Sequence, residues 1–230
     1  MTKLTLRKFY EIGQKVNNDP LVYVFENFLS NVEVEQLLAA AKPKLKQALV
    51  SDSEAGIESS GRTGRNCWVA FKHNRTIEDL SLRVAEVVGL PLDQAESLQV
   101  IHYGKTQQYS PHYDAWDAAT ERGRRCMVKG GQRLVTCLLY LNDVEEGGGT
   151  SFPNLDMEVR AKKGRMVLFH NCYQDKSIRH PDSLHGGMPV LEGEKWACNF
   201  WFRESQYQDL NKIPQRDENH SSPAKFSRVI

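Results

Sequence analysis

The chain has 230 residues, of which 40% are hydrophobic, so one domain can bury a core without disulfide or metal staples. Its 30 Lys and Arg residues nearly balance its 29 Asp and Glu residues, which gives a formal net charge of +1. This balance argues against nucleic acid or an anionic membrane as a partner that recognises the overall charge.

Residues 1–15 contain no apolar run that could form a signal-peptide core, and no later segment approaches about 18 consecutive apolar residues. We therefore expect a cytoplasmic protein without a membrane span. The five cysteines are scattered and form no CxxC pair, and Cys137 and Cys198 lie within apolar runs. We expect them to be mostly reduced and buried, and to form neither a disulfide framework nor a zinc site.

The first predicted elements are a strand and a helix. After a polar lead-in, residues 21–25 have strand composition. Ser30 followed by Glu33 is the pattern of a capping box, which predicts the start of an apolar-periodic helix. This helix should end near Pro43, because the residue before a proline disfavours helical geometry.

A loop and a second helix follow. Residues 51–66 are rich in Ser, Gly and charged residues, which predicts a mobile loop. A second helix is expected to begin at Thr76, with its apolar residues on one face. Gly89 and Pro91 should end it, because glycine favours the left-handed conformation that closes a helix.

From residue 97 onward, short apolar runs alternate with turn residues. The runs with strand composition are 97–103, 133–141, 165–170 and 195–202. Several short strands at this spacing predict a mainly β fold with flanking helices (α+β), either a sandwich or a jelly roll.

The domain organisation should be simple. We expect one domain over residues 1–203, with the β core at about 97–203 and helical N-terminal support at 20–96. The segment 204–230 loses apolar periodicity and is expected to form a surface-hugging or frayed tail. The sequence leaves the oligomeric state open.

His112 and Asp114 form a His-x-Asp pair on a segment expected to be extended. Side chains alternate between the two faces of a strand, so both would point to the same side and could share one metal ion. Such a pair often arises by chance, and a surface or core pair is the commoner outcome. A third ligand must decide between these interpretations.

Three downstream histidines are candidates for the third ligand. His170 ends a hydrophobic strand, where a satisfied core-edge histidine is favoured, and His180 lies in a charged turn where we expect it to be solvated. His185 precedes two glycines that permit close approach of the backbone, and we select it. Two imidazoles and one carboxylate on one face of a metal leave three positions open, as in the non-haem Fe(II) oxygenases.

Lys195 opens the run 195–202, which is otherwise hydrophobic enough for a buried strand. An enclosed lysine needs an anion, because an unpaired buried charge is costly or is lost by deprotonation. Taken alone, a strand-end lysine that snorkels to water is an equally good interpretation. Together with the His-x-Asp pair and His185, a buried lysine that binds the distal carboxylate of a dicarboxylic keto acid is favoured.

Three segments of the chain read QVIHYGKTQQYSPHYD, GGQRLVTCLLYLNDVEEGGGTSFP and SLHGGMPVLEGEKWACNFWFRE. They resemble the catalytic domain of the prolyl 4-hydroxylases, which are Fe(II)- and 2-oxoglutarate-dependent dioxygenases. The resemblance spans residues 20–203 and is most specific in the C-terminal half. It implies a double-stranded β-helix fold and hydroxylation of peptidyl proline at C4, with O2 as the oxidant and L-ascorbate keeping the iron reduced.

The resemblance also assigns the iron and cosubstrate residues. It implies that the iron ligands are His112, Asp114 and His185, and that Lys195 pairs with the C5 carboxylate of 2-oxoglutarate. Tyr103 and Thr150 match positions that assist this carboxylate with their hydroxyl groups, as a buried anion needs several donors.

On the substrate side, Arg62, Arg133 and Trp201 match positions associated with the peptide. From the residues alone, the two arginines would be solvated charges and Trp201 would belong to the core. The loop 51–66, which contains Arg62, is a candidate lid that closes over the peptide. The expected partner is therefore a proline-containing peptide or protein.

Two alternatives stay open. The same iron site could hydroxylate another protein residue, a small molecule such as a free amino acid, or a nucleic-acid methyl group, although no basic stripe with interleaved aromatic residues supports the last. Alternatively, a jelly-roll module could bind a divalent metal or an acidic ligand without catalysis. We expect neither nucleic acid nor membrane as a partner.

Overall fold

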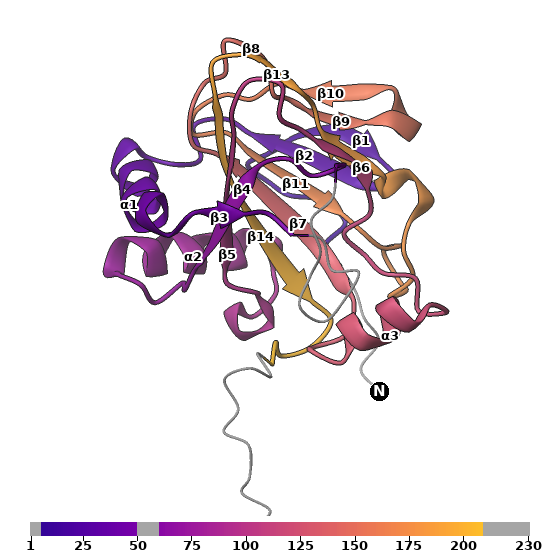
Figure 1. Cartoon of the computed structure of the whole chain (residues 1–230). Coiled ribbons are helices and arrows are strands. Elements are labelled where there is room, and N and C mark those ends of the chain that lie inside the picture. The colour runs from indigo at the N-terminus through magenta and orange to yellow at the C-terminus, as the bar shows by residue number, and fades with distance from the viewer. Residues whose placement is uncertain (1–5, 50–59, 209–230) are drawn as a thin grey trace, which may run out of the picture.

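The computed structural model describes residues 6–49 and 60–208. Eight strands form its larger sheet: β1 (Gln14–Asn18), β2 (Leu21–Phe25), β3 (Lys46–Gln47), β4 (Arg65–Val69), β5 (Leu98–Tyr103), β7 (Arg133–Tyr140), β11 (Met166–His170) and β14 (Lys195–Arg203). Their order is β1-β2-β11-β7-β14-β5-β4-β3, and all neighbouring pairs are antiparallel (Figure 1).

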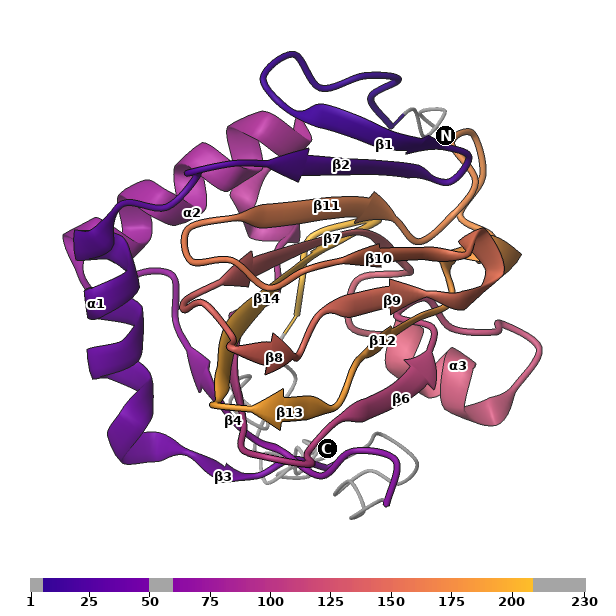
Figure 2. The same ribbon diagram turned by 90° about the horizontal axis from the view of Figure 1, so that it is seen from above.

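A smaller sheet lies over one face of the larger one. Its strands are β6 (Tyr109–His112), β9 (Thr150–Phe152), β10 (Met157–Val159) and β12 (His185–Gly187), in the order β10-β9-β12-β6. Beside it, β8 (Glu146–Gly147) pairs with β13 (Val190–Glu192). Figure 2 shows these short strands layered against the larger sheet. The arrangement is the double-stranded β-helix, or jelly roll, that the sequence predicts.

Within the described residues, three α-helices accompany the sheets, namely α1 (Asn31–Ala41), α2 (Arg75–Val88) and α3 (Glu121–Met127). The predicted capping box is present, because Ser30 Oγ accepts from Glu33 N at 3.3 Å and the Glu33 carboxylate accepts from Ser30 N at 2.8 Å. The same parts of the chain contain four 3-10 turns: Lys42–Lys44, Leu92–Gln94, Pro153–Leu155 and Pro181–Ser183.

The second helix begins one residue before the predicted Thr76. Asn74 is its N-cap, since the side-chain carbonyl oxygen accepts from Ile77 N at 2.9 Å. As predicted, the helix closes at Gly89, which adopts φ 78°. A side chain would be strained in this left-handed conformation, so glycine sets the end of the helix.

The larger sheet buries apolar side chains on both faces. One face packs against α1 and α2, where Leu37, Leu80 and Val84 meet sheet residues such as Phe200. The other face packs against the smaller sheet in a second core, whose buried members include Val22, Leu138, Tyr140, Phe152, Val167 and Phe169. Because β14 is covered on both sides, its alternate residues serve two different environments.

The predicted alternation along β14 is confirmed. Trp196, Cys198, Phe200 and Phe202 belong to the core on the helix side. Lys195, Asn199 and Trp201 instead line a pocket between the two sheets. The strand thus carries core residues on one face and polar, chemistry-bearing residues on the other.

The strand predicted at residues 21–25 is confirmed as β2, but the helical support predicted for residues 20–96 also contains β3 and β4. These two strands lie at one edge of the larger sheet, and β1, which precedes residue 20, forms the other edge. The residues of β1 are mostly exposed, and an edge strand facing water carries little apolar periodicity. Likewise, β4 begins at Arg65, inside the predicted loop 51–66, of which residues 51–59 lie outside the described residues.

Two further expectations concern the cysteines and the C-terminal segment. All five cysteines are free, and four of them are buried while Cys126 is partly exposed. Residues 204–208 follow the protein surface, with Glu204 N donating to Gln132 O and Tyr207 N donating to Asp93 O, both at 2.9 Å. The rest of the predicted tail, 209–230, lies outside the described residues.

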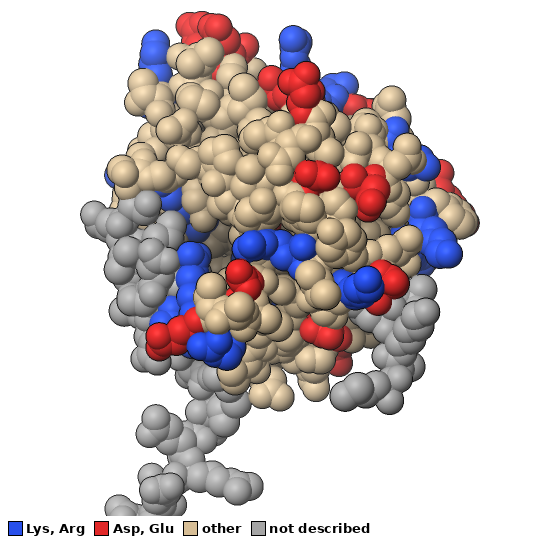
Figure 3. All heavy atoms as spheres, turned by 90° about the vertical axis from the view of Figure 1, so that its right-hand side faces the viewer, with Lys and Arg blue, Asp and Glu red and all other residues tan. Residues whose placement is uncertain are grey.

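The surface and the helices bear on possible partners. None of the helices in the described parts of the chain is both long and apolar enough to cross a membrane. On the face drawn in Figure 3, basic and acidic side chains are interspersed, in keeping with the balanced composition.

Candidate iron and 2-oxoglutarate site

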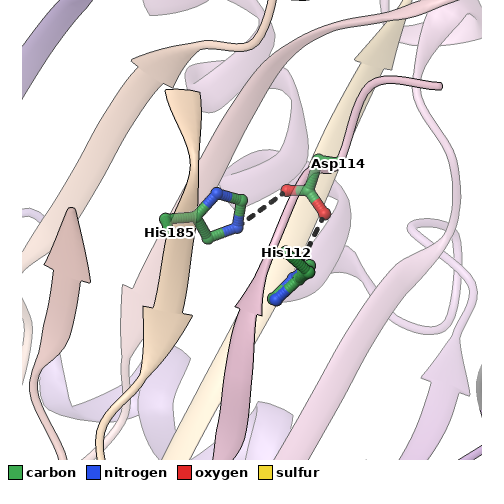
Figure 4. A group of neighbouring side chains, drawn as sticks. All are labelled: His112, Asp114 and His185. Carbon is green, nitrogen blue, oxygen red and sulfur yellow. Dashed lines mark ion pairs between the residues drawn. The ribbon is translucent and has the colours of Figure 1, made fainter. Parts of the chain in front are cut away.

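Three candidate metal ligands meet where β6 lies beside β12 (Figure 4). His112 ends β6, Asp114 follows two residues later, and His185 begins β12 directly opposite His112 in the antiparallel pair. One ligand atom from each side chain lies within 4.8 Å of the others. Strand pairing therefore brings together the three residues that the sequence analysis selected.

Both histidines are held so that Nε2 is available to a metal. His112 Nδ1 lies 2.9 Å from the Ser110 carbonyl oxygen, and His185 Nδ1 lies 2.9 Å from the Ser183 carbonyl oxygen. A carbonyl oxygen only accepts, so Nδ1 of each ring donates and Nε2 is the nitrogen left to bind a metal. Burial, reinforced by the neighbouring His185, lowers the pKa of His112 to about 3, so its ring is neutral at physiological pH.

The carboxylate of Asp114 is buried and well supplied with donors. Its Oδ2 accepts from Thr136 Oγ1 at 2.7 Å and from Trp201 Nε1 at 2.8 Å. Burial by itself would raise the pKa of Asp114, but the interactions with His185, with His112 and with a nearby arginine outweigh it and hold the pKa well below its usual range. The side chain is therefore an anion at physiological pH.

These residues fit a divalent iron. Two neutral imidazoles and one carboxylate are the ligand set of non-haem Fe(II) centres. The three side chains line the pocket between the sheets, so the side of the metal turned away from them would be accessible to small molecules. His185 joins His112 and Asp114 as a third candidate ligand, which favours the metal site over an ordinary polar pair.

Lys195 lies on the same pocket and is 2% exposed. Its Nζ donates to the Gly149 carbonyl oxygen at 3.3 Å and lies 5.3 Å from the centre of the Tyr140 ring. No carboxylate forms an ion pair with it in residues 6–49 and 60–208. Burial lowers the pKa of Lys195 to about 7. A dicarboxylic ligand would supply the missing negative charge, and the lysine does not snorkel to water.

Hydroxyl groups surround the Lys195 end of the pocket. Thr150 is buried, and its Oγ1 lies 2.6 Å from Tyr140 Oη. Tyr103 is 3% exposed and lies opposite Lys195 in the pairing of β5 with β14. Burial raises the pKa of Tyr103, so its hydroxyl keeps a proton to donate. Thr150 and Tyr103 therefore line the same pocket as Lys195, and the neighbouring Tyr140 was not among the predicted residues.

Arg62 lies in the pocket wall rather than in solvent. Only 7% of it is exposed, and its guanidinium donates to Leu49 O at 3.1 Å and to Gln99 Oε1 at 2.9 Å. It also lies 4.7 Å from the centre of the Tyr109 ring, which stacks on His112 with 3.7 Å between ring centres. Within the described residues, its buried Nε has no hydrogen-bond partner. The cation is thus held one aromatic ring away from His112.

Arg133 and Trp201 are tied into the structure behind Asp114. Arg133 forms two hydrogen bonds with the Glu96 carboxylate, at 2.6 and 2.8 Å. Its guanidinium lies 4.8 Å from the ring centre of Trp116 and 3.8 Å from that of Trp201. Both residues line the pocket, and their predicted contact with a peptide stays a prediction.

The two histidines that were not selected have structural contacts. His170 is buried and hydrogen-bonded to Tyr10 Oη at 2.8 Å, which confirms the core-edge interpretation. The expectation that His180 is solvated was wrong: it is 4% exposed and accepts from Asp182 N at 3.1 Å. Its turn folds back on Asn171, so a charged stretch of sequence is covered by the chain itself.

The sequence analysis missed several site residues. Thr136, Tyr140 and Gln99 lie on strands whose apolar composition suggested core positions only. Each faces the space between the sheets, and each is polar in an otherwise apolar run. A polar residue within a buried strand is the signal that could have identified them.

Comparison with known proteins agrees with this geometry. Residues 98–203 match a family model described as the 2OG-Fe(II) oxygenase superfamily. The chain is 36% identical over 211 residues to probable prolyl 4-hydroxylase 8 of Arabidopsis thaliana, covering 82% of this chain and 70% of the relative. It is 32% identical over 185 residues to a putative prolyl 4-hydroxylase of Acanthamoeba polyphaga mimivirus, covering 80% of this chain and 75% of that protein.

A solved structure is similar as well. The viral collagen prolyl hydroxylase of Paramecium Bursaria Chlorella virus-1, in complex with 2OG, superposes with a TM-score of 0.60 at 28% identity. The similarity covers 78% of this chain and 94% of that one. From the ligand geometry and these relatives we conclude that the chain is an enzyme of the prolyl 4-hydroxylase family, within the Fe(II)- and 2-oxoglutarate-dependent oxygenases.

Proposed function

We propose that this protein hydroxylates proline at C4 within a peptide or protein, and converts 2-oxoglutarate to succinate and CO2. The main support for the proposal is that two buried sites lie in the same pocket. The three metal ligands lie at one part of it, and Lys195, a buried cation that has no carboxylate partner in the described residues, lies at another.

The metal ligands prepare the reaction. Iron(II) bound by His112, Asp114 and His185 would supply the activation of dioxygen that is coupled to decarboxylation of the keto acid. Nδ1 of both histidines donates to a backbone carbonyl oxygen, which leaves Nε2 to bind the metal, and the ring of His112 is neutral at physiological pH. Asp114 is already ionised, so it needs no deprotonation.

Lys195 fixes the cosubstrate. Its ammonium group would pair with the C5 carboxylate of 2-oxoglutarate, and the hydroxyl groups of Thr150, Tyr140 and Tyr103 would add neutral hydrogen bonds. Because Lys195 is enclosed, this pair would form where water cannot screen it. The opposite end of the keto acid would then be directed towards the metal ligands.

Aromatic side chains support a proline as the target. Trp68 is 47% exposed at the pocket, and its ring centre lies 5.9 Å from that of Trp201. Tyr113 and Trp116 line the same pocket. Flat aromatic faces are the surfaces on which proline-rich segments pack in other recognition grooves. Arg62, which lines the pocket, is the proposed donor to a peptide carbonyl oxygen.

L-Ascorbate and a cytoplasmic location belong to the same proposal. Ascorbate would return oxidised iron to the ferrous state, so product formation should stop early when it is left out. Five free thiols, four of them buried, support a reducing compartment. Subcellular fractionation of cells that express the protein tests the location, and a signal confined to the secreted fraction would contradict it.

A peptide library tests the reaction. Proline-containing peptides are incubated with the enzyme, Fe(II), 2-oxoglutarate and ascorbate, and mass spectrometry follows the gain of one oxygen atom. Amino-acid analysis then distinguishes C4 from other positions on the ring. The matched controls are the same peptides with alanine in place of proline and the His112→Ala variant. Succinate release without oxygen gain on any prolyl peptide would show that another molecule is the substrate.

A further inference from the structure

Two of the three metal ligands are connected through residues that do not touch the metal site. Thr136 Oγ1 donates to Asp114 Oδ2 at 2.7 Å, and Asn171 Nδ2 donates to Thr136 Oγ1 at 2.8 Å. Thr136 lies on β7, and Asn171 directly follows β11. A short relay of hydrogen bonds therefore runs from the end of one strand of the larger sheet, across its neighbour, to the ligand carboxylate.

The direction of each hydrogen bond in this relay follows from which groups can donate and which can only accept. A carboxylate only accepts, so the single hydroxyl proton of Thr136 must point to Asp114. The hydroxyl oxygen can then only accept from Asn171, whose amide nitrogen is oriented accordingly. Asp114, Thr136 and Asn171 are 5%, 1% and 0% exposed, so water does not compete for these bonds.

The backbone of Asn171 leads to the second ligand. The Asn171 carbonyl oxygen accepts from His180 N at 2.9 Å. The single hydroxyl proton of Ser183 is donated to the His180 carbonyl oxygen at 2.7 Å, and Ser183 Oγ lies 3.2 Å from Asn171 O. The carbonyl oxygen of Ser183 is in turn the acceptor for His185 Nδ1 at 2.9 Å. Asn171 is thus linked to Asp114 through Thr136, and to His185 through His180 and Ser183.

We propose that Thr136 and Asn171 are positioning residues, which set the orientation of the Asp114 carboxylate relative to His185 before a metal arrives. Two donors on Oδ2, from Thr136 and Trp201, leave Oδ1 as the oxygen without a hydrogen bond in the described residues. His112 Nε2 and Arg133 Nη1 each lie 3.8 Å from this oxygen. Loss of the Thr136 donor would free the carboxylate to rotate, so the metal would bind a less ordered site.

This inference rests on the proposed metal centre, and its test measures metal binding rather than turnover. Co(II) serves as the probe, and its d–d absorption bands report both affinity and ligand geometry. Thr136→Val keeps the shape of the side chain but removes the hydroxyl. We expect roughly a 10- to 100-fold loss of Co(II) affinity and altered bands. Thr136→Ser keeps the hydroxyl and should restore wild-type affinity and bands.

A double-mutant cycle tests the role of Asn171. Asn171→Ala removes the side-chain donor but keeps the backbone bonds near His185, so a smaller loss of Co(II) affinity is expected. If its side chain acts through Thr136, Asn171→Ala should have no further effect in the Thr136→Val background. Independent, additive losses would overturn the relay.

A matched control separates positioning from general weakening of the core. Ser81 is also buried, and its hydroxyl donates to Ile77 O at 2.7 Å within α2. Ser81→Ala should leave Co(II) affinity and bands unchanged. Wild-type affinity in folded Thr136→Val, or an equal loss in Ser81→Ala, would overturn the proposal. Thermal unfolding of the metal-free variants checks that each is folded. If Thr136→Val does not fold, the Co(II) affinities of Thr136→Ser and Asn171→Ala decide the proposal.

The proposed function can fail separately. If wild-type protein binds Co(II) and Thr136→Val weakens it, the relay stands even when no prolyl peptide is hydroxylated. If wild-type protein binds no Co(II), both the metal centre and the relay are overturned.

Discussion

Asp114 and Lys195, the two buried charged residues compared in this pocket, differ in whether the protein itself supplies their partners. Asp114 is supplied with donors from Thr136 and Trp201 and with nearby histidines, and its pKa is lowered. Lys195 has one carbonyl contact and no carboxylate partner in the described residues, and burial lowers its pKa to about 7. The first charge is stabilised within the protein, whereas the second is left for a ligand to complete. A buried charge that the protein does not pair therefore indicates where an anionic ligand binds.

The largest effect on activity should come from removing a metal ligand. His112→Ala removes one of three ligand atoms, so we expect succinate release to fall to background, because the metal is no longer held. His73, which is exposed, offers the matched control, and His73→Ala should keep full activity. Succinate formation and Co(II) titration are the measurements. Residual turnover near the wild-type rate in His112→Ala would mean that the iron is bound elsewhere.

Removing the charge of Lys195 should strongly weaken the binding of 2-oxoglutarate. Lys195→Met leaves the C5 carboxylate without its partner, which is expected to cost about 2–5 kcal/mol of 2-oxoglutarate binding. Calorimetric titration with 2-oxoglutarate in the presence of Mn(II) measures it. Lys163→Met, on the exposed surface, is the control and should bind 2-oxoglutarate normally.

Lys195→Met also tests the difference between the two buried charges, Lys195 and Asp114. Without ligand, Lys195→Met should raise the free energy of unfolding, because it removes an unpaired buried amine. Asp114→Ala should lower it, because the donors Thr136 and Trp201 are left unsatisfied. Urea unfolding of the metal-free and ligand-free proteins measures both. Changes of the same sign would contradict the distinction drawn between a paired and an unpaired charge.

A smaller effect is expected on the peptide side. Arg62→Met removes the donor proposed for the peptide backbone, so the KM for a prolyl peptide should rise about tenfold, in line with one lost hydrogen bond to a charged group. The 2-oxoglutarate dissociation constant should stay near the wild-type value. Arg65→Met is the control, since Arg65 is exposed on β4. An equal change in both constants would place Arg62 at the cosubstrate instead.

A further test measures how the free energy of unfolding depends on pH. The pKa of Lys195 is about 7 in the folded chain, against an ordinary value of 10.5, so the unfolded chain binds more protons between these values. Stability of the ligand-free protein should therefore rise with pH across this window, with a slope approaching about 1.4 kcal/mol per pH unit. Urea unfolding at several pH values measures the slope.

Lys195→Met should remove this contribution. In addition, 2-oxoglutarate binding near pH 8 should take up a proton, because the carboxylate restores the charge of the lysine. Titration calorimetry in buffers of different ionisation enthalpy detects this uptake. Identical pH slopes in wild type and Lys195→Met would show that Lys195 is charged in the free protein.

Much of the fold and site could be predicted because the relevant signals are local. The capping box at Ser30, the alternation along β14 and the His-x-Asp spacing each involve residues a few positions apart. The pairing of His185 with these residues was inferred from its glycine neighbours and from resemblance to a family.

Other features depended on contacts between distant residues. The partners of the Asp114 carboxylate are 22 and 87 residues away in the chain, at Thr136 and Trp201. The burial of His180 in a charged turn, and the edge strand β1 with its polar residues, also escaped the sequence patterns.

The sequence by itself determined which side chains could carry the chemistry and on which face of each strand they lie, because spacing and periodicity are properties of neighbouring residues. Only the tertiary structure decided which buried charge is satisfied by the protein and which awaits a ligand. That distinction depends on desolvation and on hydrogen-bond partners brought together by strand pairing, and neither quantity is defined until the chain has folded.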